Sequence, residues 1–588
     1  MSGTPTVVVV EPEPGYVRVD PPPSPGALAR QRRLEEREAA RPQPRTLRRD
    51  WLPLLLVLVV QAACSGRLIG MNTAFLDEGT YIYSGYQELG HLLHGRPVAE
   101  YQSFFSGAPV IYPVVVATAD ILGGLSGTRL LSMVFMLSAT VAVHLAARRI
   151  YGSLAAFFAA ALFAALGPTQ FLGGYATYDA MALALLAWAG YFATRLATGG
   201  GYLCILPAAV AMALADATKY ASLLWSPVVL GLAVFAGWGG SPWSGVRWRR
   251  GLLLFAVWVV ALAIPAAAAG QVYLHGFTST TLQRKVASDS YGYVATAAAQ
   301  WVGALLVLAL IGTVVVLCSA SRWGANGRSA RWLALVLLVG GVLAPANQIR
   351  IHTWLSLQKH VDFGAWFSCM VAGYLLARLL PAAASRARLA AGGLAAATAV
   401  GALGWVGFGQ ATAMFTAWPD SRPLVSALTP YVQKGADQYL VEDYDVPAYY
   451  FKDRSNWQQW HDLVAVYYTD PKTHETLTGV PAIKAALAAH KYRMVVLDFM
   501  QTAGTDAQIQ PYLKQYGYRV AATVVSTTSG TTGRYTVYLA PEGQPSAPGK
   551  GQAKGSAHKG TTSKGTTSKG RTRNRNQSQG GTKTAVKK

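Results

Sequence analysis

The chain has 588 residues, of which 52% are hydrophobic and only 13% are charged. Because a soluble globular domain carries about 25% charged residues, this composition excludes an ordinary soluble protein. Apolar runs of about 17–25 residues, the length that crosses a bilayer as a helix, recur between residues 51 and 410 and predict a polytopic α-helical membrane protein. The runs cover residues 51–69, 126–147, 179–196, 220–238, 251–268, 301–320, 332–345, 363–380 and 389–408.

The formal net charge of +23 raises the question of nucleic-acid binding, because basic surfaces often bind phosphate. The distribution of the charge argues against a nucleic-acid partner. Basic residues gather in the N-terminal segment and in short loops between apolar runs, as is typical of cytoplasmic segments, and in the extreme C-terminal tail. The four cysteines lie in apolar sequence without paired spacing, so neither a disulfide framework nor a zinc site is expected.

Residues 1–50 are rich in Pro and Arg and predict a disordered cytoplasmic tail. A cytoplasmic N-terminus makes the first helix run outward, so residues 71–107 are expected outside. Residues 108–149 read as a short apolar run around Asp120, which is not expected to span alone, followed by a full-length run. About 11 to 13 transmembrane helices are expected. The same charge rule places on the outer side Asp77, Asp179, Lys219, residues 271–300 and residues 347–362.

Residues 51–410 form the predicted membrane domain, and the pattern changes after it. Within residues 419–541, the stretches DQYLVEDYDV, YRMVVLDFM and RYTVYLA have strand patterns, and residues 480–490 and 507–516 have helical spacing. A small extracytoplasmic α/β domain is therefore expected. Residues 542–588 are Lys-rich and too polar to bury a core, which predicts a second disordered tail. That tail either attracts anionic envelope polymers or lipid head groups, or only keeps the protein soluble.

An acidic pair, Asp77-Glu78, follows the first apolar run in the stretch NTAFLDEGTYIYSGYQELGHLLHG. The apolar spacing after the pair predicts an amphipathic helix along the membrane surface. A carboxylate there has the chemistry to deprotonate an acceptor hydroxyl as it attacks a sugar. Acids are also common in the first turn of any helix, because they complement its dipole. The pair alone favours this structural interpretation.

Other ionisable residues on the predicted outer side change that balance. Asp179 opens an otherwise apolar helix, where it either caps the helix or has a function. Lys219 interrupts apolar sequence, and snorkelling is its ordinary explanation. Cations gathered beside a carboxylate suit a lipid-linked phosphosugar, because charge-assisted bonds neutralise the leaving phosphate. The further cations of the set are Arg284, Lys285, Lys359 and His360, and for Lys285 a solvated loop charge is preferred.

The order of these motifs resembles the GT-C glycosyltransferases of family 39, which include protein O-mannosyltransferases and the bacterial transferase that adds aminoarabinose to lipid A. The resemblance covers about residues 51–410. The family's acidic motif after the first helix resembles Asp77-Glu78, followed by a tyrosine at Tyr81. The other matches, in chain order, are Arg129 in ILGGLSGTRLLS, Asp179, Thr218-Lys219, Gln283-Arg284 and Lys359.

The resemblance implies a GT-C-like helical bundle with an inverting mechanism and a polyprenyl- or dolichyl-phosphate sugar as donor. It implies that Asp77, with Glu78 beside it, is the catalytic base. The phosphate of the carrier would be held by Arg284, Lys219, Lys359 and the adjacent His360, with Asp179 and Tyr81 lining the same cavity. The Ala-, Gly- and Arg-rich composition suggests a bacterial source and favours a polyprenyl carrier. No cofactor is implied with certainty, and the need for a divalent metal ion stays open.

One stretch departs from the family pattern. The lipid A transferases carry a Glu-Lys pair before a proline, where this chain reads YQSFFSGAPVIYP at residues 101–113. Aminoarabinose transfer is therefore not expected, and the acceptor stays open among protein, lipid and glycan.

Two other classes of protein compete with the transferase. A transporter or flippase also places charges near a cavity, but internal repeats or paired broken helices are expected of it, and none is evident in the sequence. A membrane-anchored module whose α/β domain binds a polymer would leave Asp179 and Lys219 without a purpose. The transferase interpretation predicts that Asp77, Asp179, Lys219, Arg284 and Lys359 meet in one place.

Overall fold

The structure is a computed structural model that describes residues 47–541, except residues 238–242, 284–285, 320–322, 324–325, 382–383, 501 and 529–530. Arg284 and Lys285 therefore lie outside the described residues. So do the C-terminal tail and all but the last four residues of the predicted N-terminal tail, since the first described helix begins at residue 47.

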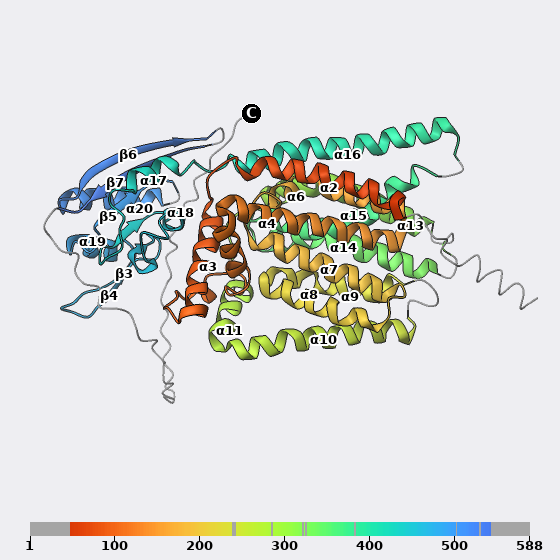
Figure 1. Ribbon diagram of the computed structural model, residues 1–588, viewed down its shortest axis with the longest axis horizontal. Coiled ribbons are helices and arrows are strands. Elements are labelled where there is room, and N and C mark those ends of the chain that lie inside the picture. The colour runs from red at the N-terminus through yellow and green to blue at the C-terminus, as the bar shows by residue number, and fades with distance from the viewer. Residues whose placement is uncertain are drawn as a thin grey trace, which may run out of the picture. The chain divides into compact units, whose positions relative to one another are not determined.

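The first part of the described chain is helical (Figure 1). Its elements are α2 (Leu47–Ile69), α3 (Leu76–His94), η1 (Tyr101–Ser103), α4 (Tyr112–Tyr151), α5 (Ser153–Ala165), α6 (Gly167–Leu172), α7 (Tyr178–Ala197), η2 (Tyr202–Cys204), α8 (Ile205–Thr218), η3 (Tyr220–Trp225), α9 (Ser226–Phe235), α10 (Gly245–Ala269), α11 (Gln271–Phe277), η4 (Thr278–Leu282), α12 (Tyr291–Ala298), η5 (Ala299–Gly303), α13 (Ala304–Cys318), α14 (Gly327–Arg350), α15 (Leu357–Arg378) and α16 (Arg386–Phe415).

Within the described residues, 7 helical stretches are long and apolar enough to cross a membrane. They confirm the predicted polytopic membrane protein. They are Trp51–Ile69, Tyr112–Tyr151, Tyr178–Ala197, Gly245–Ala269, Tyr291–Cys318, Gly327–Arg350 and Arg386–Phe415. Shorter apolar helices, among them α5, lie between these stretches. The larger expected number of crossings stays a prediction.

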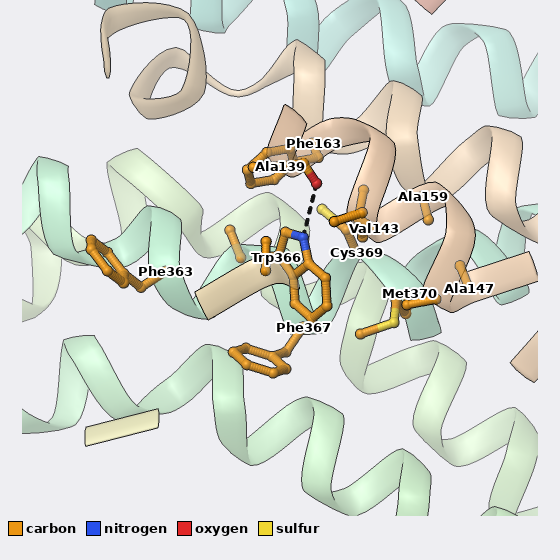
Figure 2. Packing of buried hydrophobic residues seen from close by; sticks show 14 of the residues in the cluster. Ala139, Val143, Ala147, Ala159, Phe163, Phe363, Trp366, Phe367, Cys369 and Met370 are labelled. Carbon is orange, nitrogen blue, oxygen red and sulfur yellow. Dashed lines mark hydrogen bonds between the residues drawn. The ribbon is translucent and has the colours of Figure 1, made fainter. Parts of the chain in front are cut away.

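Helix α15 runs through the interior of the bundle, as its nearly continuous apolar sequence requires. Figure 2 shows Trp366 with its indole N–H donating to the carbonyl of Ala139 on α4, at 3.0 Å. Small residues let neighbouring helices approach α15 closely. A Cβ on Gly373 would lie 2.6 Å from the carbonyl oxygen of Ala155 on α5. This packing fixes the helix whose first turn carries Lys359.

Helix α4 is broken at Gly123 and Gly124, where the backbone leaves helical geometry and Gly124 takes a positive φ of 58°. Only glycine adopts such a conformation at little cost. The break separates a short segment, which carries the buried Asp120, from a long one. The sequence predicted this division into a short and a full-length run. That the short segment does not cross the bilayer stays a prediction.

The last part of the described chain contains the predicted small sheet. Its strands are β1 (Tyr439–Val441), β2 (Trp460–His461), β3 (Tyr467–Thr469), β4 (Thr476–Thr478), β5 (Met494–Leu497), β6 (Arg519–Thr527) and β7 (Thr532–Leu539). Its helices are α17 (Arg422–Leu428), α18 (Asp445–Tyr450), α19 (Gly479–Ala488) and α20 (Ala503–Gln515), with the short turn η7 (Trp457–Gln459). The five-stranded sheet has the order β2-β1-β5-β7-β6, and β3 pairs with β4 separately. The three predicted strands, β1, β5 and β7, and both predicted helices, α19 and α20, are confirmed.

Candidate active site

The catalytic candidate Asp77 lies in the first turn of α3. The helix begins there because the Glu78 side chain folds back and accepts from the backbone N–H of Phe75 at 3.0 Å. This contact supplies a partner for one N–H that the helix itself leaves free. The side chain of Asp77 keeps 30% of its surface exposed. Its carboxylate is therefore accessible, while its neighbour is part of the helix cap.

Asp77 and three charged side chains from three other segments form one group. Lys359 at the start of α15 donates to Asp77 Oδ2 at 2.6 Å and lies 4.0 Å from Asp179 Oδ2 on α7. Lys219, at the break between α8 and η3, donates to the other oxygen of Asp179. The order Asp77, Lys359, Asp179, Lys219 alternates in sign, so the group is neutral as a whole. Both lysines are buried, and pairing offsets their desolvation.

Aromatic rings form one wall of this group. The Tyr178 ring lies 4.8 Å from the Lys219 ammonium and has its centroid 4.6 Å from that of Tyr81. Tyr81 follows Asp77 by one turn of α3, so the two side chains lie on the same face of the helix. Its ring also meets Phe105 edge-on, with centroids 5.1 Å apart. Tyr81 thus lies beside the charged group, as its candidate role requires.

Glu78 lies in a closed buried network and not beside Lys359. Arg129 on α4 binds it through two parallel bonds, Nε to Oε1 at 2.8 Å and Nη2 to Oε2 at 2.7 Å, and both side chains are fully buried. The backbone N–H of Ala176 donates to Glu78 Oε1 at 2.9 Å. Arg129 also donates to the carbonyls of Ile69, Asn72 and Thr73. The network joins the start of α3 to α4 and to the residues before α7.

This geometry argues against the catalytic role expected of Glu78, which stays a prediction. Both carboxylate oxygens accept from Arg129, and the side chain is fully buried. Adjacent residues on a helix point about 100° apart, so one acid of a pair faces the site while the other faces the core. The one signal in the sequence for this buried pair was Arg129, which was assigned only to a family motif.

Of the other predicted cations, the structure describes His360 but not Arg284. His360 follows Lys359 on α15, and its Nδ1 lies 2.8 Å from the side-chain nitrogen of Gln348 on α14. The segment after Arg284 is held against the loop before Lys359. There Asp289 accepts from the backbone N–H of Trp354 at 3.0 Å, and its own N–H donates to His352 at 3.1 Å. No pattern in the sequence predicted this contact.

Within the described residues, three acids lie close enough together to hold a metal ion, namely Glu442, Asp498 and Asp506 of the α/β part. Burial, and then the neighbouring Glu442, raise the pKa of Asp498 to about 9 and that of Asp506 to about 7. Burial alone would raise the pKa of Glu442 too, but hydrogen bonds from Asp498 and Thr502 hold it below its ordinary value. A proton on Asp498 or Asp506 reduces the repulsion among the three acids, and none of the three is a predicted site residue.

The comparisons with known proteins rest on structure. No family model matches the chain, and no curated protein matches it by sequence. ArnT from Cupriavidus metallidurans in the apo state resembles it with a TM-score of 0.55 and 16% identity, over 82% of this chain and 97% of ArnT. The form of ArnT bound to undecaprenyl phosphate gives 0.54 and 15%, with the same coverage.

ArnT is a lipid A aminoarabinose transferase of the GT-C superfamily. At this level of identity the likeness concerns the fold. The chain therefore has the GT-C fold that its motifs predicted, and it is a multi-pass membrane protein.

Proposed function

We propose that the protein is an inverting glycosyltransferase that moves a sugar from a polyprenyl-phosphate carrier to an extracytoplasmic acceptor. The observation that carries this proposal is the alternating group Asp77, Lys359, Asp179 and Lys219. It offers one accessible carboxylate beside two buried cations, within a fold whose ArnT representative binds undecaprenyl phosphate. The resident charges cancel, so an incoming phosphate competes with the carboxylates for the two ammonium groups.

In the proposed reaction the carboxylate removes a proton and the lysines stabilise the leaving phosphate. The Asp77 carboxylate takes the proton from an acceptor hydroxyl, whose oxygen attacks the anomeric carbon of the sugar. The bond from that carbon to the phosphate oxygen breaks, and the phosphate leaves with the electron pair. Lys359 and Lys219 stabilise the charge that develops on it. Attack opposite the leaving phosphate inverts the anomeric centre.

Three further residues complete the proposed site. Arg284 and His360 are candidates to bind the phosphate beside the two lysines, and Tyr81 is a candidate to line the cavity. The stretch FFSGAP at residues 104–109 replaces the Glu-Lys pair of the lipid A transferases. This departure supports an acceptor or a sugar other than theirs.

The proposal is tested with purified full-length protein in lipid nanodiscs, supplied with a panel of polyprenyl-phosphate sugars and a mixture of envelope acceptors. We expect polyprenyl phosphate to be released only when donor and acceptor are both present. If polyprenyl phosphate is released from none of the donors in the panel, the proposal is overturned. Movement of an intact lipid-linked sugar across the bilayer, without cleavage, would identify a flippase in its place.

A further inference from the structure

The phosphate-binding candidate Lys219 lies where two apolar helices are interrupted. Helix α8 ends at Thr218 and η3 begins at Tyr220, so Lys219 takes an extended conformation with φ −145° and ψ 111°. A break in apolar sequence frees backbone N–H and C=O groups, which must find partners inside the protein. The groups that pair with the backbone at this break therefore determine how Lys219 is held.

The loop between η1 and α4 supplies those partners. The N–H of Tyr220 donates to the carbonyl of Ser106 at 2.9 Å, and the N–H of Ala108 donates to the carbonyl of Ala217 at 2.8 Å. These two bonds lie on either side of Lys219 in the chain. They hold residues 106–108 against residues 217–220 in the manner of a short strand pair.

Gly107 sits between the two bonds, where the backbones approach most closely. A Cβ on this residue would lie 2.1 Å from the carbonyl oxygen of Thr218 and 3.5 Å from the Cα of Lys219. Backbone atoms cannot yield as a flexible side chain can, so any larger residue must push the loop and the helix break apart. Glycine is required here by close approach, not by a positive φ.

The same loop is anchored to the helix that carries the base. Phe105, which is 4% exposed, packs edge-on against Tyr81 one turn after Asp77. The short helix η1 just before the loop packs on α11, where a Cβ on Gly276 would lie 2.0 Å from the carbonyl oxygen of Gln102. One short segment thus contacts both the helix of Asp77 and the backbone of Lys219.

We infer that Gly107 is a positioning residue for the transfer reaction. Through residues 104–108 it sets Lys219 at the distance from Asp77 that the carrier phosphate requires. This inference rests on the proposed function. It also gives a role to the stretch in which this chain departs from the sequence pattern of the lipid A transferases.

The test compares Gly107→Ala with Gly401→Ala on α16, where an added Cβ meets nothing within 4 Å. A misplaced cation weakens binding of the carrier, so we expect a roughly tenfold rise in the donor KM of Gly107→Ala. We expect a similar rise in its Kd for polyprenyl phosphate, measured in the Asp77→Asn background. The acceptor KM and all constants of Gly401→Ala should stay unchanged.

A double-mutant cycle with Lys219→Met separates positioning from a general loss of structure. If Gly107 acts through Lys219, adding Gly107→Ala to Lys219→Met changes the donor KM little further. If Gly107→Ala raises the donor KM by the same factor in the wild type and in Lys219→Met, the inference is overturned. Phe105→Leu, a milder change in the same loop, should show the same non-additivity if Gly107→Ala fails to fold.

The two proposals fail in different ways. Wild-type protein that neither turns over nor binds polyprenyl phosphate would overturn the proposed function. Wild-type protein that does both, with additive effects of the two substitutions, would overturn only the positioning role of Gly107.

Discussion

At the scale of single residues, two neighbouring acids have opposite environments. Asp77 keeps an accessible carboxylate beside Lys359, whereas Glu78 is enclosed by Arg129 and the backbone of Ala176. The sequence placed both at the start of one helix but could not rank them. What separates them is the partner that each meets across the fold, at separations of 282 residues for Lys359 and 51 for Arg129.

We predict that Asp77→Asn abolishes transfer while leaving expression and folding intact. The substitution keeps the size of the side chain and an oxygen for Lys359 but removes the base. General-base catalysis contributes on the order of 10²–10⁴-fold in rate, so kcat should fall by that amount. Turnover assays with the preferred donor measure it. Wild-type turnover in Asp77→Asn would remove Asp77 from the role of base.

For Glu78→Gln we predict a loss of stability before any loss of chemistry. Removing one partner of a buried ion pair costs about 3–5 kcal/mol. The cost should be smaller here, because the Gln oxygen still accepts from Arg129. Thermal unfolding in detergent should show a lower Tm for Glu78→Gln than for Asp77→Asn. Residual kcat in the folded fraction should stay near that of the wild type; a loss as large as that of Asp77→Asn would return Glu78 to the catalytic site.

At the scale of elements, the α/β part packs against α3, the helix that carries Asp77, and against its neighbour α4. Asp120 on α4 accepts from the hydroxyls of Tyr86 on α3, at 2.8 Å, and Tyr449 on α18, at 2.7 Å. A Cβ on Gly79, two residues after Asp77, would lie 2.9 Å from the carbonyl oxygen of Asp445. The α/β part therefore helps to fix α3, although the sequence motifs that carry the family resemblance all lie before it.

The buried acids of the α/β part predict a pH dependence of stability. The pKa of Asp498 rises from an ordinary 3.8 to about 9 in the folded protein. Between these values the folded state holds one proton more than the unfolded state, so stability decreases as pH rises and the decrease ends near pH 9. The slope from this residue is at most about 1.4 kcal/mol per pH unit.

Asp498→Asn should flatten this dependence, because an amide still donates to Glu442 but does not titrate. We expect the Tm of the wild type to fall from pH 7 to pH 9 and that of the variant to fall less. Asp470→Asn is the matched control, since backbone N–H groups of Lys472 and Thr473 lower the pKa of that exposed acid out of the window. A wild-type Tm that rises with pH would contradict the prediction.

At the scale of the whole molecule, the sequence predicted what depends on local pattern and solvent. Apolar length predicted the membrane helices, and alternation predicted β1, β5 and β7. The meeting of Asp77, Asp179, Lys219 and Lys359 was expected from topology and from the family resemblance. The contacts of Gly107 with Thr218 and of Gly79 on α3 with Asp445 on α18 were not expected, because they join segments distant in sequence that carry no periodic or charge signal.

The last prediction concerns topology, which the charge pattern implies and which determines the side of the proposed reaction. If the N-terminus is cytoplasmic, the end of α16 (Arg386–Phe415) lies outside, together with the α/β part and the residues beyond 541. Protease added to intact spheroplasts should then cleave both. Deleting the residues after Pro541 should leave kcat on a soluble acceptor nearly unchanged, because no proposed site residue lies there. Salt-sensitive retention of full-length but not truncated protein on anionic envelope polymer would identify a partner for that segment. Protection of both regions from protease would overturn the topology and, with it, an outward-facing active site.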